Sequence, residues 1–182
     1  MSRRLLLALA AASLLLVALA ATGAAAAPRN FVTPLNGENE VPDRETRARG
    51  VAIFQLSPDG ETMSYKLNAS NIENVFMAHI HIQPVGQVIG EDNGPIAVWL
   101  FESTMPNDQA PVGGGRHDGV LVSGSFTDDV FVGPLAGMTM DDLVAAIESG
   151  RAYVNVHTND GVGETNTGPG DFPGGEIRGQ LP

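Results

Sequence analysis

The sequence contains no cysteine among its 182 residues. This absence excludes disulfide bonds, thiolate nucleophiles and a blue-copper centre, which requires a cysteine ligand. The fold must therefore be held together by an apolar core. A chain of this length supplies enough residues for one ordinary domain with such a core.

Basic residues are scarce, with 10 Lys and Arg against 21 Asp and Glu and a formal net charge of −11. Two of the basic residues, Arg3 and Arg4, lie in the first 27 residues, which hold no acidic residue. The remainder therefore carries a net charge of −13. A field of this sign disfavours nucleic acid and anionic membrane surfaces as partners and favours cations or basic proteins.

Long apolar runs are also scarce, and the one present covers residues 5–21, between Arg3-Arg4 and a stretch of alanines at residues 24–27. This pattern predicts a cleavable signal peptide over residues 1–27 and export to the periplasm, cell surface or medium. The alternative is an uncleaved membrane anchor, but the run is near the lower limit of about 17 residues for spanning a bilayer. We expect residues 28–182 to form one domain without stable membrane insertion.

Strand patterns dominate residues 28–182. Short runs rich in β-branched and alternating residues occur at 51–56, 62–69, 75–83, 96–102, 119–127, 151–158 and 176–181, and residues 31–41 add one or two short edge pieces. Ser57-Pro58-Asp59-Gly60 separates the first two runs and predicts a β-hairpin. The expected fold is all-β, a single sandwich or barrel of about seven to nine antiparallel strands.

One segment has the pattern of a helix instead. Thr139 can cap it, Asp141 and Asp142 lie in the first turn, and Gly150 can end it. Two long Gly- and Pro-rich stretches, residues 105–118 and 159–174, are expected to be loops.

Three of the four histidines lie on two predicted strands. Period-two alternation places His79 and His81 on one face of their strand, and Tyr153, Asn155 and His157 on one face of another. If the strands are neighbours, the three imidazoles converge and can bind zinc or copper. The alternative is a hydrogen-bonded polar layer without metal.

The last strand adds Glu176 and Arg178 on one face. Glu176 is a candidate supporting metal ligand or general base, but an ion pair or polar network is the favoured interpretation. The expected polar layer consists of Tyr153, Asn155, Thr158, Glu176 and Arg178. The fourth histidine, His117, falls in the first predicted loop, and Asp160, Glu164 and Asp171 in the second lack the spacing of a calcium site.

These segments together resemble the CHRD domain, a module named after chordin. The resemblance is carried by Leu35-Asn36-Gly37-Glu38-Asn39-Glu40-Val41-Pro42, Gly50-Val51-Ala52, Ala78-His79-Ile80-His81, residues 150–158 and Gly175-Glu176-Ile177-Arg178-Gly179-Gln180. It implies an extracytoplasmic domain and, because chordin antagonises growth factors, protein binding. It implies no catalytic residues.

Three functions follow as hypotheses. The first is a secreted, non-enzymatic module that binds an extracytoplasmic protein or surface component. The second is a copper- or zinc-binding domain that uses His79, His81 and His157. The third is an enzyme of the copper/zinc superoxide dismutase type, which is disfavoured because that site needs more histidines than this chain brings together.

Overall fold

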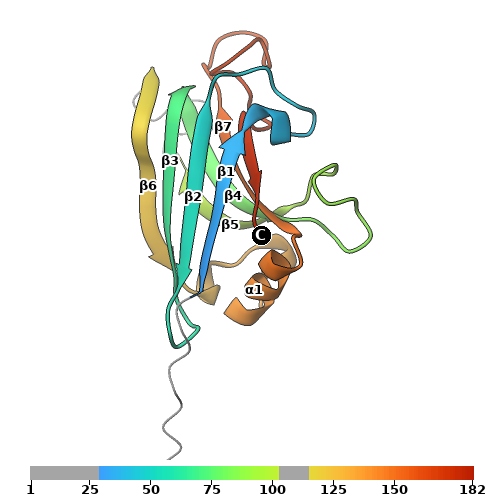
Figure 1. The fold of residues 1–182 in the computed structure, drawn as a ribbon. Coiled ribbons are helices and arrows are strands. Elements are labelled where there is room, and N and C mark those ends of the chain that lie inside the picture. The colour runs from blue at the N-terminus through green and yellow to red at the C-terminus, as the bar shows by residue number, and fades with distance from the viewer. Residues whose placement is uncertain (1–28, 103–114) are drawn as a thin grey trace, which may run out of the picture.

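The computed structural model describes residues 29–102 and 115–182 (Figure 1). The predicted signal peptide and most of the first predicted loop lie outside these residues. Within the described ranges, no helix has the length and apolar character needed to cross a membrane.

Eight antiparallel strands form one strongly curved sheet that nearly closes into a barrel, as the sequence predicts (Figure 1). The strands are β1 (Asn30–Asn36), β2 (Arg49–Leu56), β3 (Met63–Glu73), β4 (Val75–Ile82), β5 (Ile96–Glu102), β6 (Arg116–Phe126), β7 (Ala152–Thr158) and β8 (Ile177–Gln180). Their order in the sheet is β5-β4-β7-β8-β1-β2-β3-β6. The Tyr65 hydroxyl on β3 donates to the Leu100 carbonyl on β5 at 2.7 Å, and this bond links the two sides of the barrel.

The predicted helix is also present. Helix α1 spans Met140–Glu148, is capped by Thr139 and Asp142, and is followed by Gly150 with φ of +68°. Its buried face packs on the barrel core, and it lies at the lower end of the sheet in Figure 1. Three short 3-10 helices complete the fold: η1 (Gly37–Asn39), η2 (Asp128–Val130) and η3 (Gly133–Leu135).

The N-terminal strand differs from its expected position at an edge. β1 lies between β8 and β2 and pairs with β2 along its whole length. The prolines suggested an edge because proline cannot donate to a ladder. Pairing with β8 is confined to Asn36 and Arg178, and the Thr33 hydroxyl donates to the Gln180 carbonyl at 2.7 Å. This side-chain bond joins the strands beside Pro34, which has no backbone N–H.

Strands β4 and β7 are buried along almost their whole length, unlike β2, whose residues alternate between exposed and buried. One face of β4 and β7 packs on the core. Loops cover the other face, because backbone carbonyls of Gly94 and Pro173 contact its side chains. The histidines therefore lie in a covered layer rather than on an open surface.

Candidate metal centre

Strands β4 and β7 are direct neighbours and bring three imidazoles together. In their ladder, His79 is opposite Asn155 and His81 is opposite Tyr153, so the polar residues of both strands share one face. His79, His81 and His157 each offer one ring nitrogen, and these nitrogens lie within 4.8 Å of one another. We call these three residues the histidine cluster. All three are at least nine-tenths buried.

The separations suit a single ion. His79 Nδ1 lies 3.0 Å from His157 Nε2. Tetrahedral ligand nitrogens at about 2.0–2.1 Å from a zinc ion lie roughly 3.3 Å from one another. The His79–His157 separation is therefore close to coordination spacing, and all three ring nitrogens lie within 4.8 Å of one another.

Backbone carbonyls fix the tautomers of two of these rings. His81 Nδ1 lies 2.8 Å from the Gly94 carbonyl oxygen, and His157 Nδ1 lies 2.8 Å from the Pro173 carbonyl oxygen. A carbonyl can only accept, so each Nδ1 carries the proton and each Nε2 carries a lone pair. Metal-binding histidines are held in the same way, with the second ring nitrogen donating to a carbonyl or carboxylate.

Two ring nitrogens of the histidine cluster are left without a hydrogen-bond partner in the described part of the chain. His79 Nε2 and His81 Nε2 are buried and have no hydrogen-bond partner among the described residues. Asn155 Oδ1 lies 2.9 Å from His157 Nε2 in the orientation that the structure gives this amide.

Electrostatics keeps the imidazoles neutral. Burial, reinforced by the other two histidines, lowers the pKa of His79 to about 2. Burial also lowers the pKa of His157 to about 4, against the opposing effect of the Pro173 carbonyl. Burial lowers the pKa of His81 as well, although the Gly94 carbonyl opposes the shift. Neutral imidazole is the form that binds a metal ion.

Aromatic rings line the histidine cluster. The Trp99 ring meets His79 edge-on, with 4.2 Å between ring centroids, and the Tyr153 ring lies parallel to His81 at 4.8 Å. The Arg178 guanidinium stacks on Tyr153 at 3.5 Å from the ring centroid. Because β7 lies between β4 and β8, the tyrosine ring separates His81 from the arginine.

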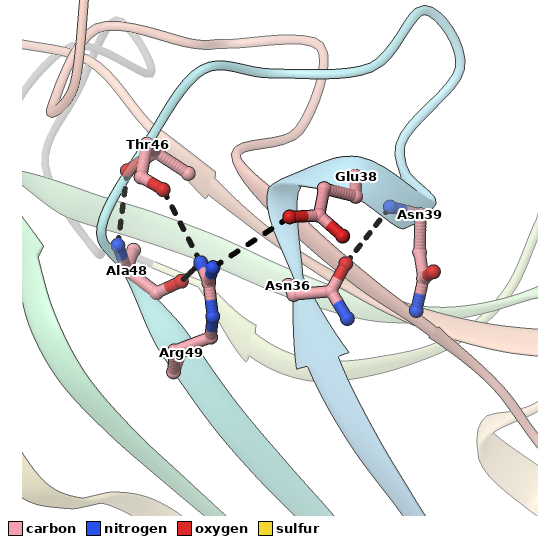
Figure 2. Close-up of polar contacts among 6 residues, drawn as sticks. All are labelled: Asn36, Glu38, Asn39, Thr46, Ala48 and Arg49. Atoms are coloured by element: carbon pink, nitrogen blue, oxygen red, sulfur yellow. Dashed lines mark hydrogen bonds and ion pairs between the residues drawn. The ribbon is translucent and has the colours of Figure 1, made fainter.

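The turn after β1 brings a buried acid to the same layer. Asn36 Oδ1 accepts a hydrogen bond from the backbone N–H of Asn39, and the Arg49 side chain donates to the Ala48 carbonyl just before β2 (Figure 2). Asn39 in turn donates to the Arg178 carbonyl at 3.2 Å. Glu40 follows, and burial raises its pKa to about 7 even though Arg178 and Arg44 oppose the shift.

A comparison with known protein families identifies the family of this chain. A family model described as the CHRD domain matches residues 31–181, nearly the whole chain. The chain belongs to the CHRD family. Searches of curated proteins and of solved structures give no match. CHRD domains are binding-type modules that are typically extracellular.

In this CHRD domain the predicted polar layer divides into two parts. Tyr153, Asn155 and Arg178 share the face of the histidine cluster. Glu176 and Thr158 belong to a second group, because Glu176 accepts from the Thr46 hydroxyl at 2.6 Å, the Thr158 hydroxyl at 2.7 Å and the Gly170 N–H at 2.9 Å. We call Glu176, Thr46, Thr158 and the Gly170 N–H the Glu176 cluster. The Glu176 carboxylate therefore accepts hydrogen bonds from these donors and is not part of the histidine cluster.

The fourth histidine of the CHRD domain lies elsewhere. His117 is in β6, opposite Ile72 of β3, and not in the loop that the sequence suggests. The strand begins three residues earlier than the run of β-branched residues indicates, because Arg116 ion-pairs with Asp118 and bonds to Asn71 on the neighbouring strand. In the loop after β7, Asp171 accepts from Thr167. Asp160 accepts from the backbone N–H of Val162, and Glu164 is exposed.

Sequence patterns miss several residues that complete the site. Glu40 lies in the stretch that carries the CHRD resemblance, but no spacing rule links it to Arg178 some 140 residues later. Trp99 is opposite His79 in the β4–β5 ladder, although a register shift precedes the pair. The carbonyls of Gly94 and Pro173 belong to loops, and backbone groups leave no signal in residue type.

Proposed function

We propose that this CHRD domain binds one transition-metal ion, copper or zinc, through His79, His81 and His157. The observation that carries the proposal is the pair of carbonyl contacts at His81 Nδ1 and His157 Nδ1. These contacts direct two unprotonated Nε2 atoms toward the third imidazole. Metal binding is then the ligand chemistry of a binding-type module rather than a catalytic activity.

The metal-free polar layer explains the geometry less well. A layer built for hydrogen bonding pairs its buried donors and acceptors, and each unpaired buried group costs roughly 1–3 kcal/mol. Here the Nε2 atoms of His79 and His81 have no partner among the described residues. A metal ion uses the unpaired His81 Nε2 lone pair, whereas a hydrogen-bonded layer leaves it without a partner.

The apolar run and alanine stretch of residues 1–27 support export, so we propose that the domain acts outside the cytoplasm. Binding of an extracytoplasmic protein remains a prediction without an assigned surface. We propose no reaction, because the superoxide dismutase hypothesis needs more histidines than the three that this cluster contains.

Metal analysis of protein purified without an affinity tag tests the proposal. We expect one equivalent of copper or zinc in the wild type and in the His117→Ala control, and loss of that ion in His157→Ala. Trp99 is the single tryptophan and contacts His79, so its fluorescence should change when the metal-free protein is titrated with the ion.

Two results would contradict the proposal that the histidine cluster binds a metal ion. If the wild type carries no stoichiometric ion and neither copper nor zinc raises its melting temperature, the histidine cluster is a structural layer. Equal metal binding by His157→Ala and His117→Ala would place the ion elsewhere in the chain.

A further inference from the structure

Met77 lies two residues before His79 on β4, which is the spacing that also separates His79 from His81. Met77, His79 and His81 alternate along the strand, and the β4–β7 ladder has no register shift between Met77 and Ile82. Their side chains therefore leave the same face of the sheet. Met77 is half-buried, while the two histidines are buried.

The same ladder places Met77 directly opposite His157. Side chains of directly opposed residues on antiparallel strands have Cβ atoms about 4.5–5.5 Å apart. A methionine has three rotatable bonds beyond its Cα, so its thioether can move within that distance to reach an ion bound to His157. The register thus places one soft candidate ligand beside the three imidazoles.

Charge around the histidine cluster disfavours an ion with two positive charges. The buried Arg178 guanidinium stacks on the Tyr153 ring, which lies parallel to His81. Glu40 interacts with this arginine, but burial raises its pKa to about 7, so it is largely neutral below that pH, and no carboxylate among the described side chains joins the converging ligand atoms. The repulsion from a fixed positive charge doubles when the ion carries two charges instead of one.

The surroundings are also apolar. The rings of Trp99 and Phe76 meet His79 and His157 edge-on, with centroids 4.2 Å and 6.3 Å apart. Apolar walls lower the local dielectric, so the penalty for burying a doubly charged ion rises further. Neutral imidazoles with a thioether are, by contrast, ligands suited to cuprous copper.

We propose that Met77 is a fourth ligand of the histidine cluster and that its thioether makes the site prefer cuprous copper to zinc. This inference rests on the proposed metal function and deepens it. It involves binding of Cu(I) without any electron transfer by the protein. Met77 supplies sulfur, while the imidazoles supply three nitrogens.

The test is a pair of competition titrations on the full-length protein. Metal-free protein competes with a chromophoric Cu(I) chelator under anaerobic conditions with ascorbate, and separately with a chromophoric Zn(II) chelator. We expect a 1:1 Cu(I) complex that Met77→Leu weakens by at least about tenfold, with Zn(II) affinity unchanged. Met138→Leu, an exposed methionine outside the site, is the matched control and should leave both affinities as in the wild type.

X-ray absorption of the Cu(I)-loaded wild type gives a readout that does not depend on a variant. A sulfur scatterer in the first coordination shell supports the assignment, and a shell of nitrogen and oxygen alone overturns it. Equal Cu(I) affinity in the wild type and Met77→Leu would also overturn it, even where His79→Ala loses the ion and the metal function stands. Failure of the wild type to bind either ion would instead overturn the metal function itself.

Discussion

Two buried polar groups share strand β7 and are satisfied to very different degrees. In the Glu176 cluster, both carboxylate oxygens accept hydrogen bonds, from two threonine hydroxyls and one backbone N–H. In the histidine cluster, two buried ring nitrogens have no partner among the described residues. Both groups are reached from β7, where Thr158 belongs to the first and His157 to the second.

The difference separates a structural role from a binding role. The Glu176 cluster ties the chain before β2 to β7 and to the loop after it, and each of its carboxylate oxygens already accepts a hydrogen bond. The histidine cluster holds its rings by their Nδ1 atoms and leaves lone pairs directed inward. Removal of a group from the first should therefore cost stability, whereas removal from the second should cost binding.

The largest expected effect is that of Glu176→Ala. The substitution leaves the Thr158 hydroxyl and the Gly170 N–H without their acceptor and opens a cavity at a fully buried position. We expect the free energy of unfolding to fall by roughly 3–5 kcal/mol, as measured by urea denaturation. Glu176→Gln keeps the shape and one acceptor, so it should cost about 1–2 kcal/mol.

A loss below about 1 kcal/mol in Glu176→Ala would show that the cluster does not hold these segments together. A folded Glu176→Ala that no longer binds the metal ion would move Glu176 into the histidine cluster. Either result would remove the contrast between the two groups.

The second effect is smaller and depends on pH. Burial raises the pKa of Glu40 from 4.5 to about 7. The folded protein therefore binds this proton more tightly than the unfolded chain, so Glu40 penalises folding above pH 7 and the penalty disappears as the pH falls to 4.5. In Glu40→Gln this penalty is absent. The free energy of unfolding of the variant, relative to that of the wild type, should therefore rise by about 3 kcal/mol between pH 4.5 and pH 8.

The matched control for Glu40→Gln is Glu38→Gln on the same turn, because the Glu38 side chain is 84% exposed (Figure 2). Urea denaturation in the presence of a chelator keeps metal binding out of the comparison. All three proteins share the same histidines, so the histidine contribution to the pH dependence cancels. If Glu40→Gln and Glu38→Gln differ from the wild type by the same amount at every pH, Glu40 is not held in a buried protonated state.

The fold was largely predictable because its signals are local. Alternation of side chains predicted β2, β3, β4 and β7, and the Pro58-Asp59-Gly60 turn predicted the hairpin between β2 and β3. Thr139 and Gly150 bounded α1. The position of β1 was wrong, because strand order depends on pairing between segments that are distant in the sequence.

The candidate site was predictable in its imidazoles and not in its surroundings. Period-two spacing placed His79 and His81 on one face, and the shared polar pattern suggested that His157 would join them. The separation of Glu176 from that group depends on Thr46, which precedes β2 and is 130 residues away. No residue pattern within one strand reports such a contact.

The smallest expected effect is that of His79→Leu on the metal-free protein. The substitution removes an imidazole with an unpaired buried nitrogen and replaces it by an apolar side chain of similar volume. It also removes the hydrogen bond to His157, so the two changes offset each other and the free energy of unfolding should stay within about 1 kcal/mol of the wild type.

The matched substitution in the Glu176 cluster is Thr158→Val, which keeps the shape but removes a hydroxyl that both donates to Glu176 and accepts from the Phe172 N–H. We expect this variant to lose about 2–3 kcal/mol, more than His79→Leu. Added metal should reverse the order of the effects: at 100 times the dissociation constant it stabilises the wild type and Thr158→Val by about 2.7 kcal/mol and leaves His79→Leu unchanged. Equal losses in the two metal-free variants would mean that the histidine cluster contributes to folding as the Glu176 cluster does, and its unpaired nitrogens would no longer argue for a ligand.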